Sequence, residues 1–317
     1  MARRSVGLRR AAARQSPKLP ESERVARRLA AIIGHGGQGA ALARELASEG
    51  IRTRADLKRP AILARLPRES QSSVLFNPVR SMPLAVASAV AAEVKRRLVF
   101  DFTREGDPRP LHFEVIPVGS VRRQASRVKD MDYLVVVPAG LESRVDRVLA
   151  AATLRPPRAG DRVEIADTYA AGTRRRSFIL RSKSFEALDP VSKRASRQPK
   201  ASRPQHYLSD LFLTTEENKP YALFHFTGSK SFNIRTRALA KRKGWLLNQY
   251  GLFDTTTEQR VRGSSAIRTE RDLAKFLGVT YRSPRGRDEP TYARQNRRNA
   301  RSKTKSKTPR RSAATSK

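Results

Sequence analysis

The chain has 317 residues, and its 66 Lys and Arg residues outnumber its 29 Asp and Glu residues, which gives a formal net charge of +37. Since there is no cysteine, disulfides, thiolate zinc sites, iron–sulfur clusters and a cysteine nucleophile are excluded. The four histidines are too dispersed for a histidine-rich metal cage, and no apolar run reaches the roughly 18 residues of a membrane-spanning helix.

Positive charge is concentrated in three segments and also covers the body of the chain. Residues 1–20, 191–205 and 291–317 carry six, five and ten Lys or Arg residues and no acid, which is 21 of the 37 excess charges. The other 16 lie elsewhere, so a phosphate-rich partner such as DNA is favoured over tails that serve solubility alone. A membrane surface is the rival partner, but no amphipathic helix with a broad basic face is apparent.

The basic termini leave the location of the protein open, except that a secretory signal is not apparent. A mitochondrial transit peptide would share the Arg-rich composition of the start, and KTKSKTPRR at 303–311 resembles a nuclear signal that would equally bind DNA. We expect residues 1–27 and 291–317 to be flexible or disordered basic tails.

The first elements in the chain are predicted helices. Helical spacing in residues 25–33 and 40–47 flanks the glycine-rich stretch GHGGQG at 34–39, and a longer helix is predicted at 83–98. Residues 28–100 are therefore expected to form an all-α, DNA-binding module.

Strands dominate the middle of the chain, and a small mixed module ends it. Runs of β-branched residues flanked by turn residues predict strands at 113–120 and 132–138. Further strands are predicted near 162–169, 175–182 and 207–213, with a helix near 143–152. We assign a mixed sheet to residues 101–216, interrupted by the basic segment 191–205, and a small α+β module to residues 217–290. The expected fold class is α+β.

The clearest chemical signal is a pair of acids at the start of a predicted strand. Asp130 and Asp132 are two residues apart, so their side chains lie on one face of the strand, and a divalent cation would relieve their repulsion. Two solvated acids at a strand end are the simpler explanation. The upstream Gly119 and Ser120 favour the cation, since a tight turn with a free hydroxyl can hold phosphate next to it.

Asp210 is the candidate for a third carboxylate. It lies inside an apolar strand, where an unpaired acid would be costly unless it has a ligand or a partner. It would complete a two-metal phosphoryl-transfer site on a neighbouring strand. An acid on an edge strand that faces water is the alternative.

These residues, in order, resemble a known family. The pattern GSVRR, DMD, YLSD and HFTGSKSFNIRTR is similar to the family X DNA polymerases, the group of DNA polymerase beta. The stretch IIGHGGQGAALARELASEGIRTRADL resembles that family's helix-hairpin-helix. The segments YALFHFTGS, NQYGLF and YRSPRGR resemble the compact polymerase of African swine fever virus and its relatives. The resemblance covers about residues 28–288 and implies a nucleotidyltransferase palm, a preceding helix-hairpin-helix module and a thumb-like end.

The resemblance implies a role for each matching residue. Asp130, Asp132 and Asp210 would be the catalytic residues and would bind two Mg²⁺ ions, for which Mn²⁺ can substitute. The residues expected to bind nucleotide are Gly119, Ser120, Arg123, His225, Phe226, Gly228 and Asn233, with Arg122 as a basic neighbour. The residues expected to bind DNA are Gly34, Gly36, Gly39 and Arg237.

Three positions depart from the beta-type pattern. His225 replaces a Tyr, although the viral type has this His, and it could instead be a packed histidine at a strand end. Lys230 replaces an acid and would add a contact to nucleotide or template, and Gln249 replaces a Glu. These differences concern fidelity and sugar discrimination, and not the reaction.

The resulting hypothesis is a monomeric, template-directed DNA-directed DNA polymerase that fills short gaps in DNA repair. Its partners would be gapped or nicked duplex DNA and dNTPs, without a membrane. The rivals are a template-independent terminal transferase, a more distant RNA nucleotidyltransferase and a basic DNA-packaging protein with an inactive polymerase core. Since Lys18 is the only lysine in the first 27 residues, we expect no efficient 5′-deoxyribose-phosphate lyase activity.

Overall fold

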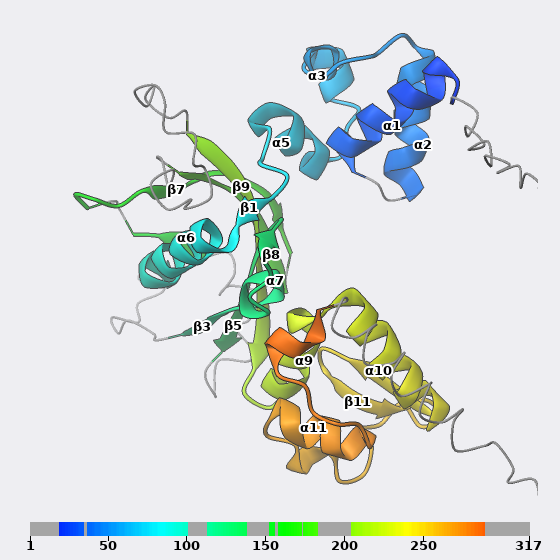
Figure 1. Cartoon of the computed structure of the whole chain (residues 1–317), viewed down its shortest axis with the longest axis vertical. Coiled ribbons are helices and arrows are strands. Elements are labelled where there is room, and N and C mark those ends of the chain that lie inside the picture. Colours follow the sequence, from blue (N-terminus) through cyan, green and yellow to red (C-terminus); the bar gives the residue numbers. More distant parts are fainter. Residues whose placement is uncertain are drawn as a thin grey trace, which may run out of the picture. The chain divides into compact units, whose positions relative to one another are not determined.

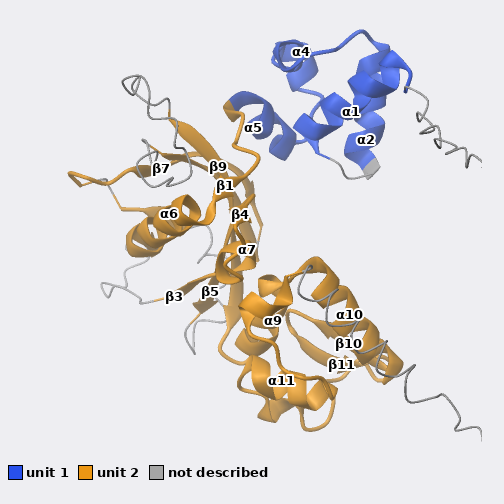
Figure 2. Cartoon of the chain, viewed as in Figure 1, with its two compact units in different colours: residues 1–75 blue, residues 76–317 orange. Residues whose placement is uncertain are grey.

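The computed structural model describes residues 19–34, 37–100, 113–137, 152–155, 158–172, 174–182 and 204–288. The chain divides into two compact units, residues 1–75 and 76–317 (Figure 2). Gly36, residues 1–18, the C-terminal tail 291–317 and most of the basic segment 191–205 lie outside the described residues. The expected N-terminal tail 1–27 is too long, since the first helix already begins at Glu21. So does the helix expected near 143–152, apart from Ala152, which begins a strand. Within the described ranges, no helix has the length and apolarity needed to cross a membrane.

The first unit is built of helices (Figure 1). They are α1 (Glu21–Ile33), α2 (Gly37–Ser48), α3 (Arg54–Leu57), α4 (Pro60–Leu63) and α5 (Arg68–Phe76), whose last residue falls in the second unit. Helix α1 has two acids in its first turn, which suits the helix dipole, and it ends at Gly34. A capping box between Thr53 and Asp56 starts α3. Leu29, Leu46 and Leu57 are fully buried and form the centre of this unit's own core.

The second unit contains a five-stranded mixed sheet. Its order is β3 (Glu114–Pro117), β5 (Met131–Val137), β9 (Gln205–Thr215), β8 (Arg175–Ser182) and β7 (Val163–Ala171). Neighbouring strands are antiparallel except β5 and β9, which run parallel. Strand β5 is almost entirely buried, whereas β9 alternates between buried and partly exposed residues. The apolar β5 is therefore a central strand, and its first residue, Met131, lies beside Ser209 in the middle of its parallel partner β9.

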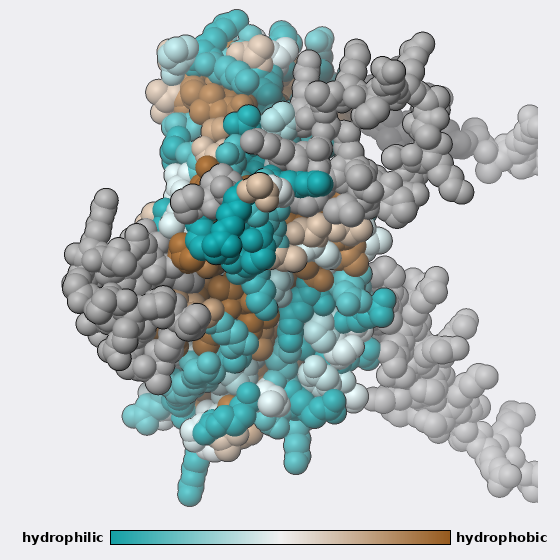
Figure 3. All heavy atoms as spheres, turned by 90° about the vertical axis from the view of Figure 1, so that its left-hand side faces the viewer, coloured by the Kyte–Doolittle hydropathy of each residue, from teal (hydrophilic) through white to brown (hydrophobic). Residues whose placement is uncertain are grey.

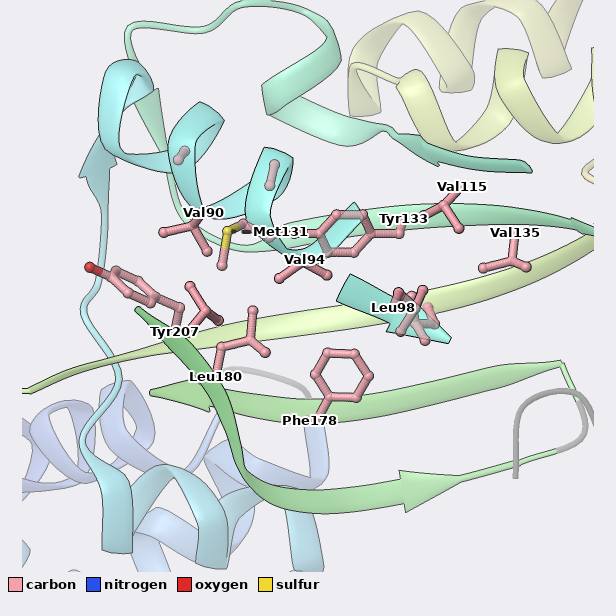
Figure 4. Packing of buried hydrophobic residues seen from close by; sticks show 14 of the residues in the cluster. Val90, Val94, Leu98, Val115, Met131, Tyr133, Val135, Phe178, Leu180 and Tyr207 are labelled. Atoms are coloured by element: carbon pink, nitrogen blue, oxygen red, sulfur yellow. Dashed lines mark hydrogen bonds between the residues drawn. The ribbon is translucent and has the colours of Figure 1, made fainter. Parts of the chain in front are cut away.

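Helix α6 (Leu84–Arg97) packs on one face of this sheet. Figure 4 shows Val90 and Val94 of the helix directed at Met131, Tyr133, Phe178 and Leu180 of the strands, all of them buried. Short strands extend both ends of this layer: β1 (Met82–Pro83) pairs with β4 (Arg127–Val128), and β2 (Leu98–Phe100) pairs with β6 (Ala152–Leu154). The helix predicted at 83–98 thus belongs to the core of the sheet.

The chain then forms a small α+β region with a core of its own. Its elements are α9 (Lys219–Thr227), α10 (Lys230–Arg242), β10 (Trp245–Asn248), β11 (Gly251–Asp254), η4 (Ser264–Ala266), α11 (Glu270–Leu277) and η5 (Pro284–Arg287). Phe224 and Phe232 pack against each other, and Trp245 packs on Phe276 with the Lys243 ammonium 5.0 Å from its ring. On the face that Figure 3 shows, the described surface is mostly hydrophilic, as the high charge of the chain requires.

Candidate active site

The turn after β3 is a single helical turn, α7 (Gly119–Arg122). Gly119 has a φ of +58°, and a Cβ at this position would lie 2.6 Å from Oδ2 of Asp132. The amide of Val118 donates to the carbonyl of Asp132 over 2.8 Å. Only glycine allows this turn to lie so close to the carboxylate, so the predicted strand at 113–120 ends before Gly119.

An open pocket of about 710 Å³ lies beside this turn. It brings together all seven residues that were predicted to bind nucleotide. It is lined by Gly119, Ser120, Arg123, Asp130, Asp132, His225, Phe226, Gly228, Ser229, Lys230, Asn233 and Asp288, among others. The hydroxyl of Ser120 is buried and has no hydrogen-bond partner within the described part of the chain. An unsatisfied donor in a pocket wall indicates a ligand with acceptor oxygens.

The predicted carboxylates lie together where the start of β5 meets the middle of β9. Asp132 on β5 and Asp210 on β9 are direct partners in the parallel pair, and Asp130 immediately precedes β5. Asp130 remains accessible to solvent, but partial burial of its carboxyl group and the charge of Asp210 raise its pKa. Burial, with the charges of Asp130 and Asp210, raises the pKa of Asp132 to about 8. These three acids therefore create negative charge that the site must neutralise.

Asp210 is held by two side chains from the neighbouring strand. The guanidinium of Arg175 lies 3.1 Å from each of its carboxylate oxygens, and the hydroxyl of Ser177 donates to Oδ1. Asp210 is therefore paired with protein groups, and it is not an edge-strand acid that faces only water.

The donor chemistry of these acids suits a hard divalent cation. Among the described residues, however, no three acids or histidines converge closely enough to form a finished ligand set. The residues fit a metal by their type, by their positions on adjacent strands and by the raised pKa values of Asp130 and Asp132. Asp210 would have to exchange Arg175 for the cation.

The α7 turn and the residue after it supply two arginines that are already paired, and one of them, Arg123, lines the pocket. Arg122 donates to the hydroxyl of Thr227 and to both oxygens of Glu270, at 2.6 and 3.1 Å. Arg123 donates to the carbonyl of Thr227 at 2.6 Å and to Oδ1 of Asp288 at 2.8 Å. Both arginines thus connect α7 to the C-terminal α+β region.

Glu270 also pairs with a second, completely buried arginine. Arg287 has no exposed surface, lies 3.0 Å from Oε1 of Glu270, and has its guanidinium over the rings of Phe224 and Phe232 at 5.0 and 4.6 Å. Burial lowers the pKa of Arg287, and Glu270 opposes that shift. The carboxylate of Glu270 therefore pairs both with Arg122 of the α7 turn and with the buried Arg287.

His225 lies in the last turn of α9, so the idea of a packed histidine at a strand end is wrong. Its Nδ1 is 2.7 Å from Nη2 of Arg237, and its carbonyl accepts from Nδ2 of Asn233 at 2.7 Å. Burial, with the nearby charge of Arg237, lowers the pKa of His225 to about 4. A neutral imidazole, with Nδ1 as acceptor, therefore orients Arg237 on α10.

Phe226 forms the other wall of this corner. Its ring stacks on Phe212 of β9 with centroids 4.1 Å apart. The next residues, Gly228 and Ser229, join α9 to α10 through a cis peptide bond. The exposed Lys230 begins α10 and also lines the pocket.

Sequence reasoning missed four residues of this arrangement: Arg175, Glu270, Arg287 and Asp288. The segment TERD carried only the signal of a helix start, which the capping box of Thr269 and Asp272 explains. Nothing local indicates that Glu270 turns inward to two arginines.

Two of the three glycines predicted to contact DNA are described. Gly34 has a φ of +112°, and a Cβ on Gly39 would lie 2.5 Å from the carbonyl oxygen of Gly34. Glycine is therefore needed to bring the start of α2 close to the end of α1. DNA binding at this turn remains a prediction.

A mixed sheet that carries carboxylates on two adjacent strands, beside an arginine-bearing helical turn, is the arrangement expected of a nucleotidyltransferase. Residues 222–288 match the family model of the DNA polymerase beta thumb. The repair DNA polymerase X of African swine fever virus (strain Badajoz 1971 Vero-adapted) is 30% identical over 206 residues, which span 65% of this chain and 99% of the viral protein. The chain therefore belongs to the family X DNA polymerases, whose nucleotidyl transfer depends on metal ions.

Two further similarities agree with this family. The DNA polymerase/3′-5′ exonuclease PolX of Bacillus subtilis (strain 168) is 27% identical over 220 residues, which span 67% of this chain and 30% of the bacterial protein. The crystal structure of Leishmania infantum polymerase beta in a ternary P/T complex matches with a TM-score of 0.58, covering 84% of this chain and all of that chain, at 20% identity. The fold is thus polymerase beta-like.

Proposed function

We propose that this repair polymerase copies a template strand to fill short gaps in duplex DNA. The primer 3′-OH would attack the α-phosphate of a complementary dNTP, add one dNMP and release pyrophosphate. The observation that carries the proposal is that Asp132, which lines the pocket together with Ser120 and Arg123, pairs in register with Asp210 on the adjacent strand. Acids for cations and donors for phosphates are thus combined in one place.

Asp130, Asp132 and Asp210 are the residues that would hold the metal, which we propose to be two Mg²⁺ ions, with Mn²⁺ as a substitute. When bound, such ions lower the pKa of the attacking hydroxyl and neutralise charge on the phosphates. Asp210 would also be placed to accept the proton of the primer hydroxyl. The raised pKa of its neighbour Asp132 reflects an environment that favours bound positive charge.

The remaining pocket residues would bind and orient the nucleotide. Ser120 and Arg123 would donate to the β- and γ-phosphates, and the main chain at Gly119 would lie close to them. Phe226 and Gly228 would line the sugar, and Asn233 would contact the incoming base. In this structure the amide of Asn233 donates to the carbonyl of His225, so contact with the base would require a change of partner.

DNA would be bound by basic residues outside the pocket and by the helical unit. Arg237, oriented by His225, would reach the template strand from α10. The glycine turn between α1 and α2 would approach a DNA phosphate through its main chain. The expected boundary at residue 100 lies too late, because α6 packs in the core of the sheet and the first unit ends at Leu75. We propose that the helical unit binds DNA, that the sheet with α6 forms the catalytic palm, that residues 217–290 bind nucleotide and template, and that the protein acts as a monomer.

Primer extension on three matched substrates tests this function. One strand is offered as a single-stranded primer, as a primer on an open template, and across a gap of one nucleotide. We expect extension only with a template, most efficient in the gap, and abolished by EDTA. Efficient untemplated addition to the single strand would instead identify a terminal transferase, and no extension on any substrate would refute the proposal.

A further inference from the structure

Asp288 lies in the nucleotide pocket on the arginine that is proposed to bind the triphosphate. Its Oδ1 is 2.8 Å from Nε of Arg123, and both side chains line the pocket of about 710 Å³. The pair is only partly accessible, with 16% of the Arg123 side chain and 30% of the Asp288 side chain exposed. A carboxylate here occupies a donor that a phosphate oxygen would use.

The position of Asp288 is fixed by its neighbours. The preceding residue, Arg287, is fully buried, and its Nε donates to the carbonyl of Arg282 at 3.1 Å. The carbonyl of Arg287 accepts from the hydroxyl of Ser229 at 2.7 Å. Because Ser229 is itself a pocket residue, the main chain just before Asp288 is tied to the wall that would face the nucleotide.

Arg123 is held from two directions. Its Nη1 donates to the carbonyl of Thr227, which keeps the guanidinium at the pocket wall, while Nε faces Asp288. A triphosphate can approach the same guanidinium, but Asp288 would repel its negative charge. The nearby hydroxyl of Ser120 has no such competitor among the described residues.

We propose that Asp288 is a specificity-determining residue that competes with the β- and γ-phosphates for Arg123, so that nucleotide binds by displacing an internal carboxylate. The proposal deepens, and rests on, the proposed polymerase function. Only a ligand with enough anionic oxygens to replace Asp288 and also engage Ser120 binds tightly. Ligands with no phosphate gain nothing from the exchange.

Two binding measurements test the competition. In the first, isothermal titration calorimetry measures tripolyphosphate binding to the protein alone, for wild type and for Asp288→Asn, Asp288→Glu and Glu164→Gln. Glu164 on β7 is a matched control. It pairs with Arg181 at 3.2 Å and is not among the residues that line the pocket, and its replacement by Gln removes the same charge. We expect Asp288→Asn to bind roughly two- to fivefold more tightly, as for a partly exposed ion pair. Asp288→Glu should stay near wild type, and Glu164→Gln should not change.

The second measurement uses gapped DNA with a dideoxy primer end, Mg²⁺ and the complementary dNTP, so that binding occurs without reaction. The dissociation constant of the dNTP should fall by the same factor in Asp288→Asn. An unchanged or weaker affinity in Asp288→Asn, with wild-type thermal stability, overturns the proposal. An equal gain in Glu164→Gln would also overturn it, because net charge would then be the cause. If the wild-type protein binds tripolyphosphate but neither binds dNTP nor extends a primer, the proposed polymerase function is refuted. The tripolyphosphate titrations then still decide whether Asp288 competes with phosphate for Arg123.

Discussion

The two sides of the pocket hold their charges in opposite ways. On the strand side, Asp130, Asp132 and Asp210 are brought together, and Arg175 pairs with Asp210. On the side of α7, Arg122 and Arg123 each have a carboxylate partner. The first side has an excess of like charge that favours an added cation. On the second side each arginine already has a carboxylate partner, and a substrate must replace that partner in order to bind.

Removing one acid from the strand side should have the largest effect. Asp210→Ala should reduce nucleotide incorporation by at least about a thousandfold, because it removes a ligand of the ions that stabilise the transferring phosphate. DNA binding, measured by fluorescence anisotropy on a gapped duplex, should stay near wild type. Extension at a near wild-type rate would mean that the carboxylates of this strand edge are not the catalytic group.

Removing the charge of Glu270 on the α7 side should mainly lower the stability of the fold. Glu270→Gln leaves the buried guanidinium of Arg287 without its counter-charge, and Arg122 loses both of its bonds to a carboxylate. We expect the free energy of unfolding in urea to fall by about 3–5 kcal/mol. The exposed pair of Glu164 provides the control, since Glu164→Gln should cost less than about 1 kcal/mol. Similar losses in the two variants would show that Glu270 does not hold the two arginines.

His225 lies between the two sides and gives the site a dependence on pH. Because burial and Arg237 lower its pKa to about 4, the folded protein resists a proton that the unfolded chain accepts below its ordinary value of 6.5. The free energy of unfolding should therefore decrease as pH falls from about 6.5 to 4, by about 1–2 kcal/mol for this partly exposed residue. His225→Asn should remove that part of the decrease, as unfolding curves at several pH values would show. An identical pH dependence in the variant would contradict the assignment.

Replacing Ser120 should have the smallest effect of these substitutions. It should change nucleotide binding while leaving the free energy of unfolding almost unchanged. Its hydroxyl has no partner among the described residues, so Ser120→Ala should change the free energy of unfolding by less than about 0.5 kcal/mol. Loss of a donor to the phosphates should nevertheless raise the KM for dNTP by roughly twofold to tenfold. An unchanged KM would place the phosphates elsewhere in the pocket.

The strand side was largely predictable from the sequence, and the α7 side was not. The spacing of Asp130 and Asp132 and the cost of an acid within the apolar run of β9 are local signals. The register that pairs Asp132 with Asp210 depends on a parallel contact between distant segments, which no local pattern specifies. The partners of Arg122 and Arg123 likewise come from α11 and from the residue after η5.

Element types were least predictable where apolar runs were short. The sequence at 221–226 could not be assigned to a strand or to a helix, because a short apolar run fits a strand and a buried helix equally well. The structure makes it part of α9, and this places His225 and Phe226 on one helical turn. By contrast, the strand predicted at 175–182 coincides with β8, whose four central residues, Ser177–Leu180, are buried.

The hairpin of β10 and β11 supplies an internal optical probe. Trp245 is the chain's one tryptophan, and it packs on Phe276 with Lys243 close to its ring. Its emission therefore reports on the C-terminal α+β region, and the helical unit has no such fluorophore. Because the sequence also lacks cysteine, a dye can be attached to one introduced thiol in residues 19–75 without any background reaction. The two units can then be followed by separate colours in a single sample.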